Sequence, residues 1–156
     1  MGVEGEKRFV YRGPRFPDPG ITPVTYREEF FQPALELESD LFEEMRRDAG
    51  ITPHRIADSD PEQLKGIAGF FIKHSETFLF LLEGDVLIGN TLFLGNRIQS
   101  LCVAKQYQRR GYGRKLTACA VNRILDGEYS TVVLETLPGN EIAERLYRSM
   151  GFQEVT

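Results

Sequence analysis

The side chains with the clearest potential for chemistry lie in one short basic segment, Gln108-Arg109-Arg110-Gly111-Tyr112-Gly113-Arg114. Every charged residue between positions 104 and 115 is basic. Glycine allows a backbone to approach a ligand closely. A helix that begins at these glycines would add unpaired N–H groups and a partial positive charge. The segment therefore predicts a site for an anionic group such as a pyrophosphate. The alternative is a plain glycine turn that caps a helix.

Two other kinds of phosphate-binding loop do not fit this segment. The sequence G-x-x-x-x-G-K-[ST] of a P-loop is absent. The dinucleotide-binding pattern requires a third glycine at position 116, where this chain has Leu116.

The elements around the basic segment predict a mixed α/β fold. Helices are expected over 33–49 and from Asp60 onward. Three strands over 77–82, 86–94 and 97–103 are joined by short glycine-containing turns, which favour antiparallel pairing. A helix over 111–125, a strand over 130–137 and a helix over 140–150 then follow. This order indicates an antiparallel meander followed by a β-α-β-α crossover.

Bulk properties restrict the class of protein. The chain has 156 residues and a net charge of -4, so neither nucleic acid nor a membrane surface is expected as its partner. Cys102 and Cys119 form no CxxC pair, which favours the reducing cytoplasm and argues against a structural zinc site. Residues 1–32 are proline-rich and are expected to be irregular, apart from a possible edge strand at 9–12 or 24–26. Residues 33–156 are expected to form one domain.

Two motifs resemble those of a known enzyme family. The segment 108–113 is similar to the Q/R-x-x-G-x-G/A signature of the GCN5-related N-acetyltransferase (GNAT) superfamily. Residues 140–152, from Asn140 through Ala143 and Tyr147 to Gly151-Phe152, are similar to its second signature, N-x-x-A-x-x-x-Y-x-x-x-G-F. The resemblance covers about residues 33–152, and it implies a bent sheet whose central strands part to form a cleft for acetyl-CoA.

The resemblance also implies roles for individual residues. The main chain of residues 101–103 would bond the pantetheine arm, and the N–H groups of 109–114 would hold the pyrophosphate. The residues implied at the cofactor are Leu101, Cys102, Val103, Gln108, Arg109, Arg110, Gly111, Tyr112, Gly113, Arg114, Asn140 and Tyr147. No metal is implied.

The implied reaction is direct transfer of an acetyl group from acetyl-CoA to a primary amine of a small molecule or peptide. Tyr147 is the candidate acid for the departing thiolate, with partly buried core packing as its alternative. Glu135 is the best-placed candidate base. The alternatives are that Glu135 is an outward-facing strand residue, or that a water chain to the main chain removes the proton. The excess of acids between Glu28 and Glu62 hints at a cationic acceptor.

One departure from the family pattern concerns the carboxyl end. The family continues after G-F with two more strands, whereas only residues 153–156 remain here. The C-terminal strands are thus expected to be truncated, with the missing place filled by the first 33 residues or by a partner chain in a homodimer. A non-catalytic acyl-CoA-binding or protein-interaction module with an incomplete acceptor site is the alternative function.

Overall fold

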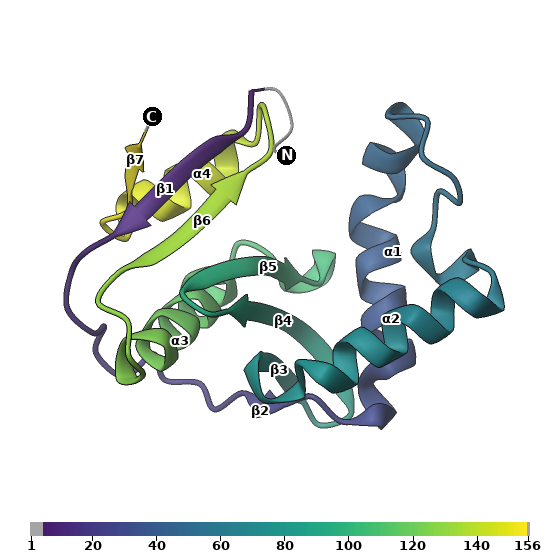
Figure 1. The fold of residues 1–156 in the computed structure, drawn as a ribbon, viewed down its shortest axis with the longest axis horizontal. Coiled ribbons are helices and arrows are strands. Elements are labelled where there is room, and N and C mark those ends of the chain that lie inside the picture. The colour runs from purple at the N-terminus through teal and green to yellow at the C-terminus, as the bar shows by residue number, and fades with distance from the viewer. Residues whose placement is uncertain (1–4, 156) are drawn as a thin grey trace.

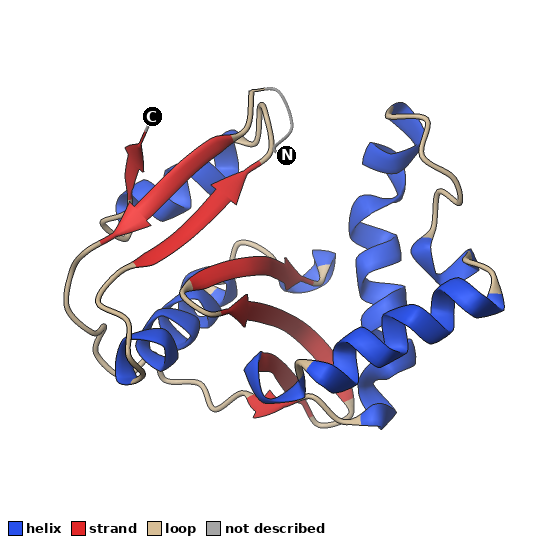
Figure 2. Ribbon diagram, viewed as in Figure 1, coloured by secondary structure: helices blue, strands red, loops and turns tan. Residues whose placement is uncertain are grey.

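A computed structural model describes residues 5–155 as one seven-stranded sheet with helices on both faces (Figures 1 and 2). The strands are ordered β2-β3-β4-β5-β6-β1-β7. All neighbouring pairs are antiparallel except β5 and β6. The strand bounds are β1 Lys7–Tyr11, β2 Val24–Thr25, β3 Phe78–Glu83, β4 Val86–Leu94, β5 Arg97–Val103, β6 Val132–Thr136 and β7 Gln153–Val155. This mixed sheet confirms the expected fold class.

The four α-helices divide between the two faces. The helices α1 (Phe31–Asp48) and α2 (Pro61–Lys73) pack over β3 and β4, where the core contains Ala34, Phe71 and Phe80. The helices α3 (Tyr112–Asp126) and α4 (Glu141–Ser149) cover the other face, with Val121 and Tyr147 in their core. Four short 3₁₀ turns occupy Glu28–Phe30, Ile56–Asp58, Ser75–Thr77 and Lys105–Tyr107.

Local signals in the sequence explain where two helices begin. Asp60 accepts a hydrogen bond from the Gln63 backbone N–H, and the Gln63 side chain accepts one from the Asp60 N–H, so α2 begins with a capping box. Asn140 accepts from the backbone N–H of Ala143 at 3.2 Å and caps α4. Both caps confirm the sequence-based expectations.

The segment that was expected to be irregular contributes two strands to the sheet. The piece at 24–26 forms β2 at one edge, whereas the piece at 9–12 belongs to β1, which lies between β6 and β7. Of the two alternatives, the edge strand is therefore the piece at 24–26. Phe9, Val10 and Tyr11 are all buried, so hydrophobic burial on both faces explains the interior position. Residues 7–11 thus fill the place beside β6, and β7 is the short strand that follows Phe152.

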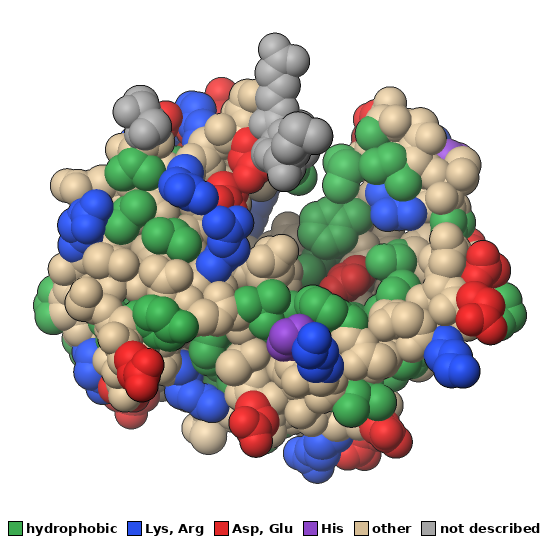
Figure 3. Space-filling view, in the orientation of Figure 1, with side chains coloured by type: hydrophobic (Ala, Val, Ile, Leu, Met, Phe, Trp, Pro, Cys, Tyr) green, Lys and Arg blue, Asp and Glu red, His purple; other side chains and the backbone are tan. Residues whose placement is uncertain are grey.

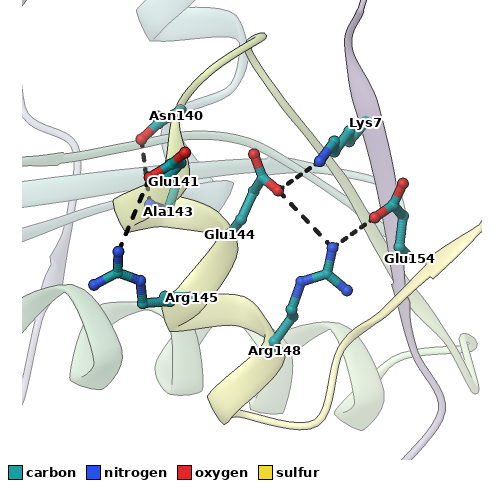
Figure 4. Close-up of polar contacts among 8 residues, drawn as sticks. All are labelled: Lys7, Asn140, Glu141, Ala143, Glu144, Arg145, Arg148 and Glu154. Atoms are coloured by element: carbon teal, nitrogen blue, oxygen red, sulfur yellow. Dashed lines mark hydrogen bonds and ion pairs between the residues drawn. The ribbon is translucent and has the colours of Figure 1, made fainter.

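Polar contacts hold α4 against β1 and β7 (Figure 4). Lys7 Nζ of β1 lies 2.8 Å from a Glu144 carboxylate oxygen on α4. Arg148, one turn later, contacts both Glu144 and Glu154 of β7. Because Tyr147 lies between these residues on α4, the contacts also fix the position of its ring.

Gly89 of β4 permits β4 and β5 to lie close together beside α3. A Cβ atom on Gly89 would lie 2.4 Å from the main-chain oxygen of Cys102, 3.1 Å from Cδ1 of Leu116 and 3.3 Å from Cα of Val103. The nearest obstacle is backbone, which cannot rotate away, so only glycine fits.

We expect Gly89→Ala to destabilise the chain by about 1–3 kcal/mol, since β5 must move to accept the methyl group. Gly69→Ala in α2 is the matched control, because nothing lies within 4 Å of its added Cβ, and it should stabilise by up to about 1 kcal/mol. Urea unfolding of both variants measures the difference. A Gly89→Ala chain as stable as the unsubstituted one would contradict this packing.

Candidate active site

The parting of β5 from β6 creates a cleft on the sheet. The two parallel strands pair at Arg97 and Val133, near the start of each strand, and they diverge toward their carboxyl ends. The cleft between them, here called the β5–β6 cleft, has a volume of about 670 Å³. It is lined by β5, the loop after it, the start of α3, β6 and α4. Figure 3 shows the molecule hollowed between the half that carries β1 and β6 and the half that carries α1 and α2.

One edge of the cleft is formed by backbone groups of β5. The Ala104 N–H donates to Ile88 of β4, and Cys102 is paired with Asn90 of β4. Because alternate residues of a strand face opposite edges, the N–H and C=O groups of Leu101 and Val103 face the cleft. Those of Cys102 face β4 instead, so the expected main-chain contact at Cys102 is not favoured by this register.

The mouth of the cleft is the basic glycine loop. Arg109 and Gly111 have positive φ angles of 64° and 86°, and α3 begins at Tyr112 without a side-chain cap. Left-handed residues turn successive N–H groups toward one side, which is the geometry of a backbone anion site. The N–H groups at the start of α3 are therefore available to an anionic ligand.

The side chains of the loop have separate structural contacts. Gln108 Nε2 donates to the Val103 carbonyl at 2.9 Å. Arg114 donates to Ser149 Oγ and thereby joins α3 to α4. Arg110 stacks over the Tyr107 ring at 5.4 Å and, unlike Arg109 and Arg114, is not among the cleft-lining residues.

Tyr147 contributes to the wall of the cleft at its α4 side. Its ring packs between Phe9 and Phe152, with ring centroids 6.4 and 5.6 Å away, and only 7% of the residue is exposed. Burial, with a further contribution from Cys102, raises the pKa of the Tyr147 hydroxyl to about 12. At neutral pH the phenol therefore keeps its proton and can act as an acid.

The structure adds cleft residues that no sequence signal identified. Thr136 of β6 lines the cleft, and its buried Oγ1 has no hydrogen-bond partner among the described residues. Gln99 and Ser100 of β5 line it too. Asn140, in contrast, is expected at the cofactor from the second motif, and it lines the cleft beside its capping role. Thr136 and Ser100 carry short hydroxyl side chains within strands, and this sequence context does not predict that they line the cleft.

Glu135 lines the cleft, but both of its carboxylate oxygens are already bonded. Arg8 of β1 donates to Oε1 from Nη2 at 3.2 Å, and Arg97 of β5 donates to Oε2 at 2.7 Å. These contacts join three strands at the point where β5 and β6 are paired. They favour a structural role for Glu135 over that of a general base, because both of its carboxylate oxygens already accept hydrogen bonds from arginine side chains.

Cys102 is a buried thiol beneath α1, beside Leu37. Burial raises its pKa, and the nearby Glu38 raises it further. A thiol that stays protonated is a poor nucleophile, so Cys102 is a packing residue.

We expect a double-mutant cycle of Glu135→Gln and Arg97→Gln to give a coupling free energy of about 1 kcal/mol that falls as salt is added. The pair of Arg15 and Asp126, whose side chains are both about half exposed, is the matched control and should give almost none. Urea unfolding at low and high ionic strength measures both couplings. Zero coupling between Glu135 and Arg97 would contradict the structural role.

Comparison with known proteins agrees with this geometry. Residues 26–152 match the family model described as acetyltransferase (GNAT) family. Over 57 residues the chain is 37% identical to the [ribosomal protein bS18]-alanine N-acetyltransferase of Haemophilus ducreyi. That alignment covers 36% of this chain and 39% of the relative.

Solved structures share the fold at low sequence identity. A GCN5-related N-acetyltransferase from Sphaerobacter thermophilus has a TM-score of 0.64 and 22% identity; the match covers 96% of this chain but only 48% of that one. The yncA protein of Salmonella typhimurium, solved with its cofactor acetyl-CoA, has a TM-score of 0.63 and 16% identity, with coverage of 87% and 81%. The first of these proteins and the Haemophilus relative are therefore more than twice as long as the segment they share with this chain. Because the family model matches most of this chain, over residues 26–152, the chain belongs to the acetyltransferase (GNAT) family.

Proposed function

We propose that this chain transfers an acetyl group from acetyl-CoA to a primary amine, by direct attack within a ternary complex. The observation that carries the proposal is the arrangement of the β5–β6 cleft. A basic glycine loop without a side-chain cap lies at its mouth, strand backbone of β5 runs along one edge, and Tyr147 lies in its α4 wall.

The residues present fit acetyl-CoA, which supplies the activated acetyl thioester. The N–H groups at the start of α3 suit a pyrophosphate. Leu101 offers its N–H and C=O groups, and Val103 its N–H group, to an extended amide-containing arm, in the manner of an added strand. The Val103 C=O already accepts from the Gln108 side chain. Thr136 Oγ1 adds a further polar group within the cleft.

Tyr147 acts in this proposal as the acid. Attack of the amine nitrogen on the thioester carbonyl forms a C–N bond, and the C–S bond then breaks. The Tyr147 hydroxyl gives its proton to the sulfur that leaves, so that a neutral thiol departs. The packing of the ring against Phe9 and Phe152 favours this role because it fixes the hydroxyl at the wall of the cleft.

The acceptor is proposed only as a class. The names of the Haemophilus relative and of the Xenopus laevis N-alpha-acetyltransferase 30 point to the α-amine of a polypeptide. The acids of α1 give less support to a strongly cationic acceptor, since Glu36 and Asp40 each lie 3.0 Å from Arg55. A cytoplasmic location, from the free cysteines, and a homodimer are further proposals.

The competing function is a module that binds acyl-CoA without catalysis. It needs the same loop but assigns no chemistry to Tyr147. Both functions predict acetyl-CoA binding, and only transfer to an amine separates them.

We expect Tyr147→Phe to lower kcat by about 100-fold or more, because it removes the acid. Thermal stabilisation by acetyl-CoA should remain, since Phe keeps the packing against Phe9 and Phe152. Tyr107→Phe, which removes a hydroxyl from the loop side of the same cleft, is the matched control and should stay near the unsubstituted rate. Thiol release with phenethylamine and with an alanine-initiated peptide as acceptors measures turnover. Unchanged turnover in Tyr147→Phe would remove this residue from the mechanism.

A further inference from the structure

A second hollow lies on the other side of β5, between α1, α2 and the sheet. This α1–α2 pocket has a volume of about 660 Å³. Its walls are largely apolar and include Ile67, Phe70 and Phe71 of α2, with Phe78 and Leu92 of the sheet. It shares Gln99 and Ser100 with the β5–β6 cleft, so the two hollows meet at β5.

Glu38 of α1 is the one carboxylate among the described residues that line this pocket. No hydrogen bond or ion pair to another described residue satisfies its oxygens, in contrast to the paired Glu36, Asp40 and Glu43 on the same helix. A partly buried acid without a partner is unfavourable for stability, so its position calls for a functional explanation.

The charged and titratable groups around Glu38 are few. Arg46 lines the same pocket from α1, but its Nε donates to the Pro53 carbonyl. The sheet contributes Cys102, whose pKa Glu38 raises. Among the pocket-lining residues, α2 contributes Gln63 as its polar side chain and no charged one. Burial is accordingly the cause that raises the pKa of the Glu38 carboxyl.

Glu38 and Tyr147 lie on opposite sides of β5 and share Cys102 as an electrostatic neighbour. The cleft with its candidate acid and the pocket with its carboxylate meet at the middle of β5, where Gln99 and Ser100 line both. His54 and His74 line neither hollow, so neither histidine competes for the role of base.

We propose that Glu38 is the catalytic base, which accepts the proton of an amine seated in the α1–α2 pocket. The inference rests on the proposed acetyl transfer. As the amine nitrogen bonds to the carbonyl carbon, one N–H proton passes to the Glu38 carboxylate. The C–S electrons leave with sulfur, which takes the Tyr147 proton. The proton on Glu38 then returns to the tyrosine through solvent, so that one amine and one thioester become one amide and one thiol.

The pocket also limits the class of acceptor. One carboxylate set among aromatic and aliphatic walls suits a single amine on an apolar group. A polyamine would place its additional charges against Phe70 and Phe71, without anionic partners there.

The test compares Glu38→Gln with Glu44→Gln, an exposed glutamate on the same helix that lines neither hollow. With phenethylamine as acceptor, we expect Glu38→Gln to lower kcat/KM about 100-fold or more at pH 7, with acetyl-CoA binding unchanged. The unsubstituted chain should lose activity as pH falls through the raised pKa of Glu38, and Glu38→Gln should lack this limb of the profile. Glu44→Gln should match the unsubstituted chain.

Stability supplies a second readout. A raised carboxyl pKa means that folding favours the protonated form, so ionisation of Glu38 costs stability as pH rises through that pKa. Glu38→Gln should therefore unfold at a higher temperature than the unsubstituted chain at pH 7, and this gain should disappear at pH 4. A gain in stability with loss of turnover is the signature of a functional group held at a cost.

The outcomes separate the two proposals. If the unsubstituted chain binds acetyl-CoA and transfers acetyl to neither phenethylamine, spermidine nor an alanine-initiated peptide, the proposed function fails and the base assignment with it. If it transfers acetyl and Glu38→Gln keeps both the rate and the acidic limb, the base assignment alone is overturned. Transfer to spermidine in preference to phenethylamine would overturn the proposed acceptor class.

Discussion

The divergence of β5 from β6 is the constraint on which the rest of the structure depends. The two strands pair at Arg97 and Val133 and nowhere further along. Glu135 bonds both Arg97 and Arg8, which joins β5, β6 and β1 at that same end. A sheet held together at one end and open at the other leaves the backbone of Leu101 and Val103 without ladder partners. The Val103 carbonyl accepts from the Gln108 side chain. The other three groups require a ligand or water, and the cleft offers them to a ligand.

The interior position of β1 stabilises β6, whose other edge borders the open cleft. With β1 bonded to β6 on one side and to β7 on the other, β6 has a complete ladder along the edge that faces away from the cleft. Phe9 of β1 is fully buried and touches the ring of Tyr147. The first strand of the chain therefore supports the candidate acid directly, and Lys7 and Glu144 hold α4 above it.

Local sequence signals predicted most elements, and long-range pairing explains where they failed. The strands at 86–94 and 97–103 and the cap at Asn140 follow from turns and side chains within a few residues. The interior position of β1 depends on partners about 125 residues away, which no local pattern records. The same limit applies to Glu135, whose partner Arg8 lies 127 residues earlier. The sequence does not distinguish Glu38 from the neighbouring acids of α1. Only tertiary packing does, because it places Glu38 in the α1–α2 pocket and pairs Glu36 and Asp40 with Arg55.

Hydrogen exchange with and without acetyl-CoA tests the central claim most directly, because it reads the backbone of β5 one residue at a time. The amides of Leu101 and Val103 face the cleft, and that of Cys102 faces β4 as an internal control. The account predicts that acetyl-CoA slows exchange at Leu101, Val103 and residues 111–114, while Cys102 stays slow throughout. Unchanged exchange at Leu101 and Val103 under saturating acetyl-CoA would contradict the assignment of the β5–β6 cleft as the binding site.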